Sequence, residues 1–233
     1  MPRSGLYRGR PRDRISLRRE ALAVARQGWL TLRAVRRPRR HVGVSRVAVF
    51  VHGFGAAGPV FDPMRARVER ELDIATVDFS YGPFSTFESI AERFERHVER
   101  CVPPDARISL VGHSLGGLIA RWYVQEQVRA PRVDHVVTLA TPHAGTRSAR
   151  FAPVPVAESL KPGSPLIERL SAGRHRARDA AHFALVAGAD VLCSPPHSAA
   201  SLDGAEVVWI DDLGHNELLF DERVHALVVH ALR

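Results

Sequence analysis

The sequence predicts an α/β fold with a doubly wound, mostly parallel sheet and helices on both of its faces. Three observations lead to this prediction. Apolar runs of strand length alternate with segments of helical periodicity over most of the chain. The first apolar run is nearly continuous, which is typical of a strand buried on both faces of a parallel sheet. The length of 233 residues suits one large domain of this class.

Six apolar runs are expected to form the strands of the sheet. The first reads RVAVFVH and has no charged residue after its opening arginine. The remaining runs have a similar length and are spaced so that a helix fits between most of them. The expected strands are Arg46–His52, Ile74–Phe79, Arg107–Gly112, Val133–Ala140, His182–Gly188 and Ala205–Ile210.

Segments between these runs carry apolar residues at the spacing of an amphipathic helix. Two consecutive prolines, Pro103 and Pro104, mark the end of one such segment. Alternation of strand and helix predicts right-handed crossovers between parallel strands. The expected helices are Phe61–Leu72, Thr86–Cys101, Leu115–Arg129 and Glu217–Leu232.

Positive charge is concentrated at the start of the chain. The whole chain has 33 Lys and Arg against 25 Asp and Glu, a net charge of +8. Residues 1–46 alone contain 14 arginines and two acids, which gives +12 there and leaves −4 for residues 47–233. A nucleic-acid binder usually carries a basic stripe on its folded body, interleaved with aromatic residues. The charge distribution therefore argues against a nucleic-acid partner.

Residues 1–45 are expected to form a basic N-terminal arm outside the folded body. From Ile15 to Val35, apolar residues recur at helical spacing, which predicts an amphipathic helix. Arginines interrupt its apolar stretch, so it does not resemble a secretory signal. Two interpretations stay open: the helix docks on the body, or it lies on an anionic membrane surface.

The chain has no run of about 18 uncharged apolar residues, so we expect no transmembrane helix. Its two cysteines, Cys101 and Cys193, are too few for a disulfide scaffold and fit a reducing compartment. We therefore expect a cytoplasmic protein, peripheral at the membrane if the N-terminal helix binds lipid. The sequence leaves the oligomeric state open.

A glycine-rich turn, Gly112-His113-Ser114-Leu115-Gly116-Gly117, joins an expected strand directly to an expected helix. It has the G-x-S-x-G pattern of a nucleophile elbow. A chain that passes from strand to helix with almost no loop must turn sharply, and glycines give room where a Cβ would collide. Ser114 then stands at a helix N-terminus, which favours developing negative charge. Ser114 is the predicted nucleophile, and a serine that only caps the helix is the alternative.

A second glycine-rich turn, His52-Gly53-Phe54-Gly55, follows the first expected strand. Acyl transfer passes through a tetrahedral oxyanion that two preorganised N–H donors must stabilise. The backbone N–H of Leu115, next to the nucleophile, is one expected donor. The backbone N–H of Phe54 is the other, because both turns lie at the carboxyl edge of the sheet. An ordinary turn at the end of a strand is the alternative for residues 52–55.

A general base and an acid are expected after the nucleophile. His215 lies in a loop between the last strand and the last helix, and an ordinary imidazole pKa suits a base at neutral pH. Asp190 follows an apolar strand, so its carboxylate emerges at the carboxyl edge and can orient His215. The alternatives are Asp203, Asp211 and Asp212 as the acid, and His52, His113, His143, His182 and His197 as the base.

Five motifs occur in this order: HGFG at 52–55, GHSLGG at 112–117, TPHAGT at 141–146, SLKPGSP at 159–165 and GHN at 214–216. Together they resemble the bacterial triacylglycerol lipase and esterase branch of the α/β-hydrolases. The resemblance extends over residues 46–233 and leaves out residues 1–45. It implies the α/β-hydrolase fold, the triad and oxyanion donors named above, and chemistry without a metal or other cofactor.

A Pro-rich segment, residues 143–181, is expected to be a small lid or cap insertion in the hydrolase domain of residues 46–233. It either opens over the serine or forms a static wall of the acyl pocket. An insertion of this size predicts a shallow site that suits medium acyl chains. Phe151, His113 and Tyr81 are expected to contact the substrate.

These observations predict a serine carboxylic-ester hydrolase, a lipase or esterase that works through an acyl-enzyme intermediate. Its substrate is expected to be an acyl ester or a lipid. An acyltransferase or a thioesterase with the same triad is the alternative within enzymes. A non-catalytic binding module on the same fold is the alternative from another class.

Overall fold

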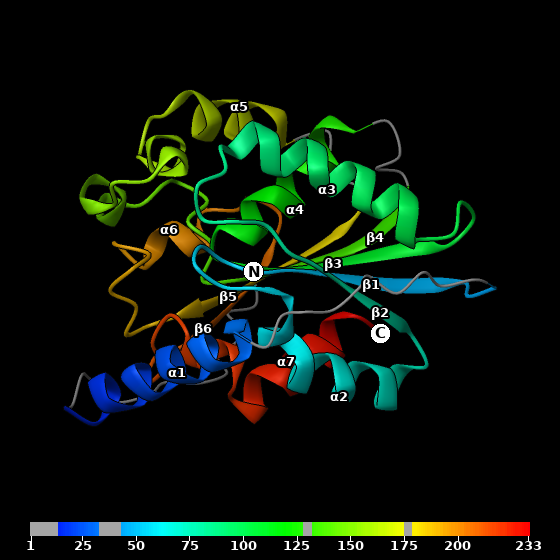
Figure 1. The fold of residues 1–233 in the computed structure, drawn as a ribbon, viewed down its shortest axis with the longest axis horizontal. Coiled ribbons are helices and arrows are strands. Elements are labelled where there is room, and N and C mark those ends of the chain that lie inside the picture. Colours follow the sequence, from blue (N-terminus) through cyan, green and yellow to red (C-terminus); the bar gives the residue numbers. More distant parts are fainter. Residues whose placement is uncertain (1–13, 33–42, 128–131, 175–178) are drawn as a thin grey trace.

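The computed structural model describes residues 14–32, 43–127, 132–174 and 179–233. Six strands form one parallel sheet in the order β2-β1-β3-β4-β5-β6 (Figure 1). All six predicted strands are confirmed, with ends that differ by no more than a residue or two. The strands are β1 Arg46–Val51, β2 Ala75–Phe79, β3 Arg107–His113, β4 Val133–Leu139, β5 Ala181–Ala187 and β6 Glu206–Ile210.

Helices cover both faces of this sheet, so the doubly wound α/β class is confirmed. One face carries α3 Phe87–Cys101, α4 Leu115–Glu126 and α5 Pro165–Gly173 (Figure 1). The other face carries α2 Asp62–Leu72 and α7 Glu222–Ala231. The helix α1, Arg14–Leu32, lies beside this second layer.

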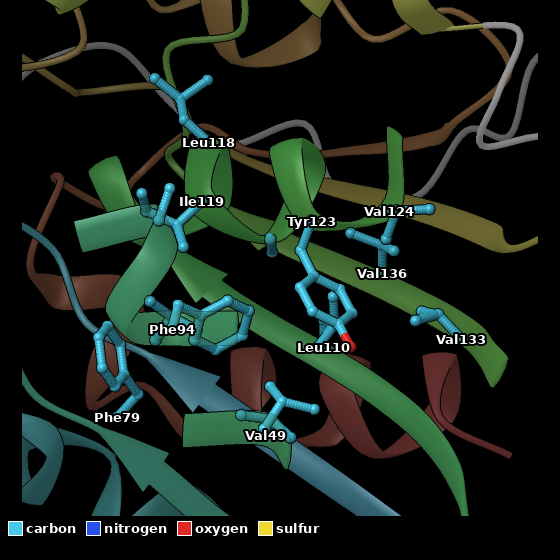
Figure 2. Packing of buried hydrophobic residues seen from close by; sticks show 14 of the residues in the cluster. Val49, Phe79, Phe94, Leu110, Leu118, Ile119, Tyr123, Val124, Val133 and Val136 are labelled. Carbon is cyan, nitrogen blue, oxygen red and sulfur yellow. The ribbon is translucent and has the colours of Figure 1, made fainter. Parts of the chain in front are cut away.

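Burial of β1 on both sides explains its nearly continuous apolar sequence. Val49 packs in the cluster beneath α3 and α4, whereas Phe50 packs in the cluster beneath α2 and α7. Figure 2 shows Val49 with Phe94 and Tyr123, whose rings meet edge to face at 5.4 Å. The strand is therefore fixed between two helical layers, and the loop that follows it has a rigid base.

The predicted helix Glu217–Leu232 is wrong in its first turn. A short 3-10 helix, Glu217–Leu219, comes first, and α7 begins only at Glu222. The reason is Asp221, whose side chain accepts the backbone N–H of Arg223 and caps a new helix N-terminus. Residues 217–219 therefore form a short turn of their own between His215 and α7.

The N-terminal helix is confirmed as Arg14–Leu32, and residues 33–35 of the prediction lie outside the described ranges. The helix expected to end at Arg129 ends at Glu126. None of the helices in the described ranges is both long and apolar enough to cross a membrane.

The segment 143–181 follows β4 and contains two short 3-10 helices, Arg147–Phe151 and Pro155–Leu160, before α5. Its role as a lid stays a prediction. In a parallel sheet of this kind, the turns after β1, β3, β5 and β6 meet at one edge, where the predicted site residues lie.

Candidate active site

Ser114 occupies a strained turn between β3 and α4. Its φ of 53° and ψ of −122° lie in a region that a residue with a side chain rarely adopts. Its backbone N–H donates to the carbonyl of Leu139 at 2.8 Å, which fixes the turn against β4. The side chain therefore stands at the N-terminus of α4, as the glycine pattern predicts.

Two glycines make this turn sterically feasible. A Cβ on Gly112 would lie 2.5 Å from the backbone nitrogen of Gly117, and a Cβ on Gly116 would lie 2.6 Å from the carbonyl oxygen of His52. The elbow thus packs directly on the end of β1 and on its own helix. The glycines at these positions are required by close approach of the backbone.

Replacing Gly112 with alanine is expected to lower the free energy of unfolding by about 2 kcal/mol. The new methyl group would press on the backbone of Gly117, which cannot move aside as a flexible side chain can. Urea denaturation of the two proteins measures the difference. Gly82→Ala is the control, since nothing lies within 4 Å of its Cβ position. An equal loss of stability in both variants would contradict this explanation.

The turn after β1 lies against the nucleophile. A Cβ on Gly53 would be 3.0 Å from the Cβ of Ser114, so the glycine allows the two turns to touch. The neighbouring Phe54 is 40% exposed at this edge. Leu115 is the first residue of α4, where a backbone N–H has no partner within the helix. Both predicted oxyanion donors thus belong to turns adjacent to Ser114.

His52 and Tyr81 hold this turn from behind. The Nδ1–H of His52 donates to the carbonyl of Gly53 at 2.7 Å, and Nε2 accepts the backbone N–H of Tyr81 at 3.1 Å. The Tyr81 hydroxyl donates to the carbonyl of His52 at 2.7 Å, and the rings stack at 4.2 Å. Burial lowers the pKa of His52 to about 4, so the ring is neutral. Tyr81 is buried, and its contacts are those of a residue that shapes the turn.

Asp190 and His215 form a buried pair. The Nδ1–H of His215 donates to Oδ2 of Asp190 at 2.7 Å. The other carboxylate oxygen of Asp190 accepts the backbone N–H groups of Leu192 and Cys193 at 2.8 and 2.7 Å. With its carboxylate held in this way, Asp190 fixes the tautomer of His215 and leaves Nε2 to accept a proton.

Two of the alternative acids, Asp203 and Asp212, are engaged elsewhere. Asp212 pairs with Arg223 at 3.0 Å, and Asp203 pairs with Arg174. Among the alternative bases, His143 is buried with Nε2 3.1 Å from the hydroxyl of Thr138.

His113 supports the loop that carries the predicted base, His215. Its Nε2–H donates to the carbonyl oxygen of His215 at 3.0 Å, and the two rings lie 4.7 Å apart. Burial, with His215 as the next cause, holds the pKa of His113 well below the ordinary value, so His113 is neutral. These contacts place His113 behind the loop of His215, and its predicted contact with the substrate stays a prediction.

Phe151 lies at the exposed end of the first 3-10 helix of the insertion, with 87% of its surface accessible. The adjoining chain is bonded to the segment after Asp190: the Ser148 hydroxyl donates to the carbonyl of Val191, and that of Thr146 donates to the carbonyl of Leu192. The insertion thus borders the loop that carries Asp190, the predicted acid. The sequence motif at residues 141–146 includes Thr146 but does not indicate that its hydroxyl bonds to the loop after Asp190.

The structure also brings Glu20 of α1 to the loop that carries His215, which the sequence did not predict. Its carboxylate accepts the backbone N–H of Asn216 at 3.0 Å. No motif marks this glutamate, and a docked amphipathic helix was the only signal that pointed toward such a contact.

Within the described ranges, no cluster of three or more His, Cys, Asp or Glu side chains could hold a metal ion. The residues assembled at this edge are instead a serine, an imidazole, a carboxylate and two glycine-rich turns. Such a set can perform nucleophilic acyl transfer.

Two curated relatives match parts of the chain. GPI inositol-deacylase from Candida albicans is 34% identical over 84 residues, which cover 32% of this chain and 21% of the relative. Pimeloyl-[acyl-carrier protein] methyl ester esterase from Aliivibrio salmonicida is 31% identical over 105 residues, which cover 45% of this chain and 37% of the relative. The matched regions therefore span well under half the length of each relative.

Solved structures with the same fold cover most of the chain. The mature form of the Bacillus licheniformis lipase BlEst2 aligns with a TM-score of 0.59 and 14% identity, over 83% of this chain and 96% of that one. A hydrolase from Pseudomonas aeruginosa aligns with a TM-score of 0.58 and 16% identity, over 84% and 92%. Identities this low show the shared α/β-hydrolase fold.

The family model described as palmitoyl protein thioesterase matches residues 48–181, which is more than half of the chain. The matched region includes Ser114 and ends before Asp190 and His215. The expected membership of the α/β-hydrolases is thus confirmed, and the narrower resemblance to the lipase and esterase branch stays a prediction. The chain belongs to the palmitoyl protein thioesterase family of the α/β-hydrolases.

Proposed function

We propose that this protein hydrolyses carboxylic acyl esters through an acyl-enzyme intermediate on Ser114. The observation that carries the proposal is the buried His215–Asp190 hydrogen bond of 2.7 Å at the sheet edge that also presents the strained serine. A module that only binds a ligand has no use for a backbone strained at a nucleophile. The curated methyl ester esterase that matches part of this chain supports an ester as substrate.

In the proposed reaction, Ser114 Oγ attacks the acyl carbonyl while Nε2 of His215 takes its proton. Asp190 stabilises the imidazolium that forms. The backbone N–H groups of Phe54 and Leu115 donate to the oxyanion. His215 then protonates the leaving oxygen, and the alcohol departs. Water, deprotonated by His215, attacks the acyl-enzyme and releases the carboxylic acid and free Ser114.

A thioesterase is the second candidate, and the family match favours it. The same residues serve both reactions, because the acyl carbonyl and its oxyanion are the same in an oxoester and a thioester. The leaving group differs: a thiol departs in place of an alcohol. Acyl transfer to an alcohol remains the variant in which the acceptor replaces water.

Hydrolysis of p-nitrophenyl esters from C2 to C16 and of acyl thioesters with matched chains tests these alternatives. We expect the wild type to cleave medium-chain esters best and the Ser114→Ala variant to be inactive on all of them. Faster cleavage of thioesters at every chain length would favour the second candidate. A maximum at the acetyl ester would contradict a site for medium chains, and inactivity on both series would reject acyl hydrolysis.

The exposed apolar surface supports a lipid interface as the place of reaction. Within the described ranges, large apolar side chains that stay exposed lie in α1 or in loops after the carboxyl ends of strands. In Figure 1, α1 and the insertion lie on the same side of the molecule, at the left. These side chains are Leu22, Val24, Trp29, Leu32, Phe54, Phe84, Phe151, Val191 and Leu192.

We propose that α1 lies on an anionic membrane surface with its exposed face, on which Arg18 and Trp29 are placed. The Arg18→Glu variant should bind vesicles with one third anionic lipid about 5- to 30-fold more weakly, since the lost cation contributes about 1 kcal/mol near such a surface and the new anion is repelled by up to a similar amount. Co-sedimentation measures the affinity.

Arg96→Glu on α3 is the matched control for this prediction, because it makes the same charge change at an exposed position on another helix. Its binding should stay within twofold of the wild type. Equal weakening by both substitutions would contradict a docking face on α1 and indicate a general charge effect.

A further inference from the structure

The carboxylate of Glu20 bonds directly to the segment that follows His215. It accepts the backbone N–H of Asn216 at 3.0 Å, the Asn216 side-chain amide at 2.7 Å and the backbone N–H of Glu217 at 3.2 Å. Hydrogen bonds to an ionised carboxylate are stronger than those between neutral groups. One side chain of α1 therefore holds the two residues after the predicted base.

The loop is shaped to receive this carboxylate. A Cβ on Gly214 would lie 2.5 Å from Oε2 of Glu20, so the carboxylate occupies the space that a side chain on this residue would take. The N–H of Gly214 donates to Oε2 of Glu217 at 2.7 Å, which closes the loop on itself. Glu20 thus sits in a site formed by the backbone on both sides of the base.

Arg19 adds a second contact from the same helix. Its Nε lies 2.9 Å from Oε1 of Glu217, and its guanidinium donates to the carbonyl of Asp212 at 2.5 Å. These two partners flank the loop before and after His215. Arg19 and Glu20, which are adjacent in α1, therefore bond to the chain both before and after His215.

Apolar packing of α1 on the body is sparse by comparison. Ala23 is the one buried apolar residue among the α1 side chains that the structure describes, and Leu22 and Trp29 are 70% and 51% exposed. Arg26 lies over the ring of Phe220 at 4.5 Å, beyond residues 212–217 to which Arg19 and Glu20 bond. The polar contacts of Arg19 and Glu20 in α1 thus go to residues 212–217 around His215.

We infer that Glu20 is a positioning residue for the reaction: its carboxylate holds the backbone after His215 so that the imidazole stays aligned with Ser114. The inference rests on the proposed function. Three groups then fix the base from three directions. Asp190 holds its Nδ1–H, His113 holds its carbonyl from inside, and Glu20 holds the next two N–H groups from outside. The helix that carries Glu20 lies outside the matched family region.

Steady-state kinetics of Glu20→Ala and Glu20→Gln on a soluble p-nitrophenyl ester test this inference. We expect kcat of Glu20→Ala to fall about 10- to 100-fold with KM within twofold, as misplacement of a catalytic group predicts. Glu20→Gln keeps one acceptor oxygen and should lie between Glu20→Ala and the wild type. Arg26→Ala is the matched control, because it removes an α1 contact to Phe220 and none to the backbone of residues 214–217, and its kcat should be unchanged.

A second measurement does not depend on turnover. The proton between His215 Nδ1 and Asp190 should give a far-downfield ¹H NMR signal, identified by its loss in His215→Gln. This signal should broaden or shift in Glu20→Ala and stay in place in Arg26→Ala. If Glu20→Ala proves unstable in a thermal melt, Glu20→Gln carries both comparisons.

An unchanged kcat and NMR signal in the Glu20 variants would overturn the inference. The same fall in kcat in Arg26→Ala would also overturn it, since general docking of α1 would then be the cause. If the wild type cleaves no ester or thioester, the proposed function fails, and the NMR signal alone decides whether Glu20 positions His215.

Discussion

Replacing Ser114 with alanine should lower kcat for a medium-chain ester at least about 10³-fold. The variant removes the oxygen that forms the acyl-enzyme, and water cannot take its place at the strained turn. KM should change little, because the acyl pocket and both oxyanion donors remain. Initial rates on p-nitrophenyl esters, at equal protein concentration determined by absorbance, measure the effect.

Ser171→Ala is the control for this experiment, since Ser171 is an exposed serine on α5. Its turnover should equal that of the wild type. If Ser114→Ala retained turnover within tenfold of the wild type, Ser114 would not be the nucleophile. The thermal melt of Ser114→Ala should match the wild type or rise, because alanine removes a polar group from a strained position.

Replacing Asp190 with asparagine should lower kcat about 10³- to 10⁴-fold. The amide oxygen can still accept the N–H groups of Leu192 and Cys193, so the loop keeps its shape. The amide nitrogen then faces Nδ1 of His215 as a donor, which reverses the tautomer and places the proton on Nε2. An imidazole protonated at Nε2 cannot take the proton of Ser114.

Asp212→Asn is the matched control for Asp190→Asn, because Asp212 was an alternative acid in the sequence and pairs with Arg223 in the structure. Its kcat should stay within a few-fold of the wild type. A larger loss in Asp212→Asn than in Asp190→Asn would show that the acid is assigned to the wrong residue.

The sheet could be predicted because its strands follow a strong local signal. The sequence RVAVFV of β1 is buried on both faces, and a continuous apolar run is the direct consequence of that burial. The start of the last helix could not be predicted in the same way. Glu217–Leu219 fits helical periodicity, and only the side chain of Asp221 shows where the true helix begins.

The predicted acid and base come together because they follow neighbouring strands, β5 and β6, at one sheet edge. A topology rule was therefore sufficient to pair Asp190 with His215. The contact between Glu20 and Asn216 spans 196 positions in the chain and depends on where α1 docks. No rule of spacing or composition predicts it, since tertiary packing alone brings the two residues together.

The contacts of Tyr81 and His113 with substrate stay predictions, and the structure adds a second function that the sequence did not suggest for either residue. Both lie in or near the motifs, and proximity to the nucleophile suggested contact with substrate. The structure gives each of them a backbone carbonyl as partner, that of His52 for Tyr81 and that of His215 for His113. Aromatic and imidazole groups behind an active site bury apolar area and fix loops, and their sequence context is the same as that of a binding residue.

Labelling with a fluorophosphonate tests the central assignment most directly, because this reagent forms a stable adduct with an activated serine. The wild type and Ser114→Ala are incubated with the reagent, digested and analysed by mass spectrometry. We expect one adduct, on Ser114, in the wild type and none in the variant. An adduct on another residue, or equal labelling of the two proteins, would contradict the assignment.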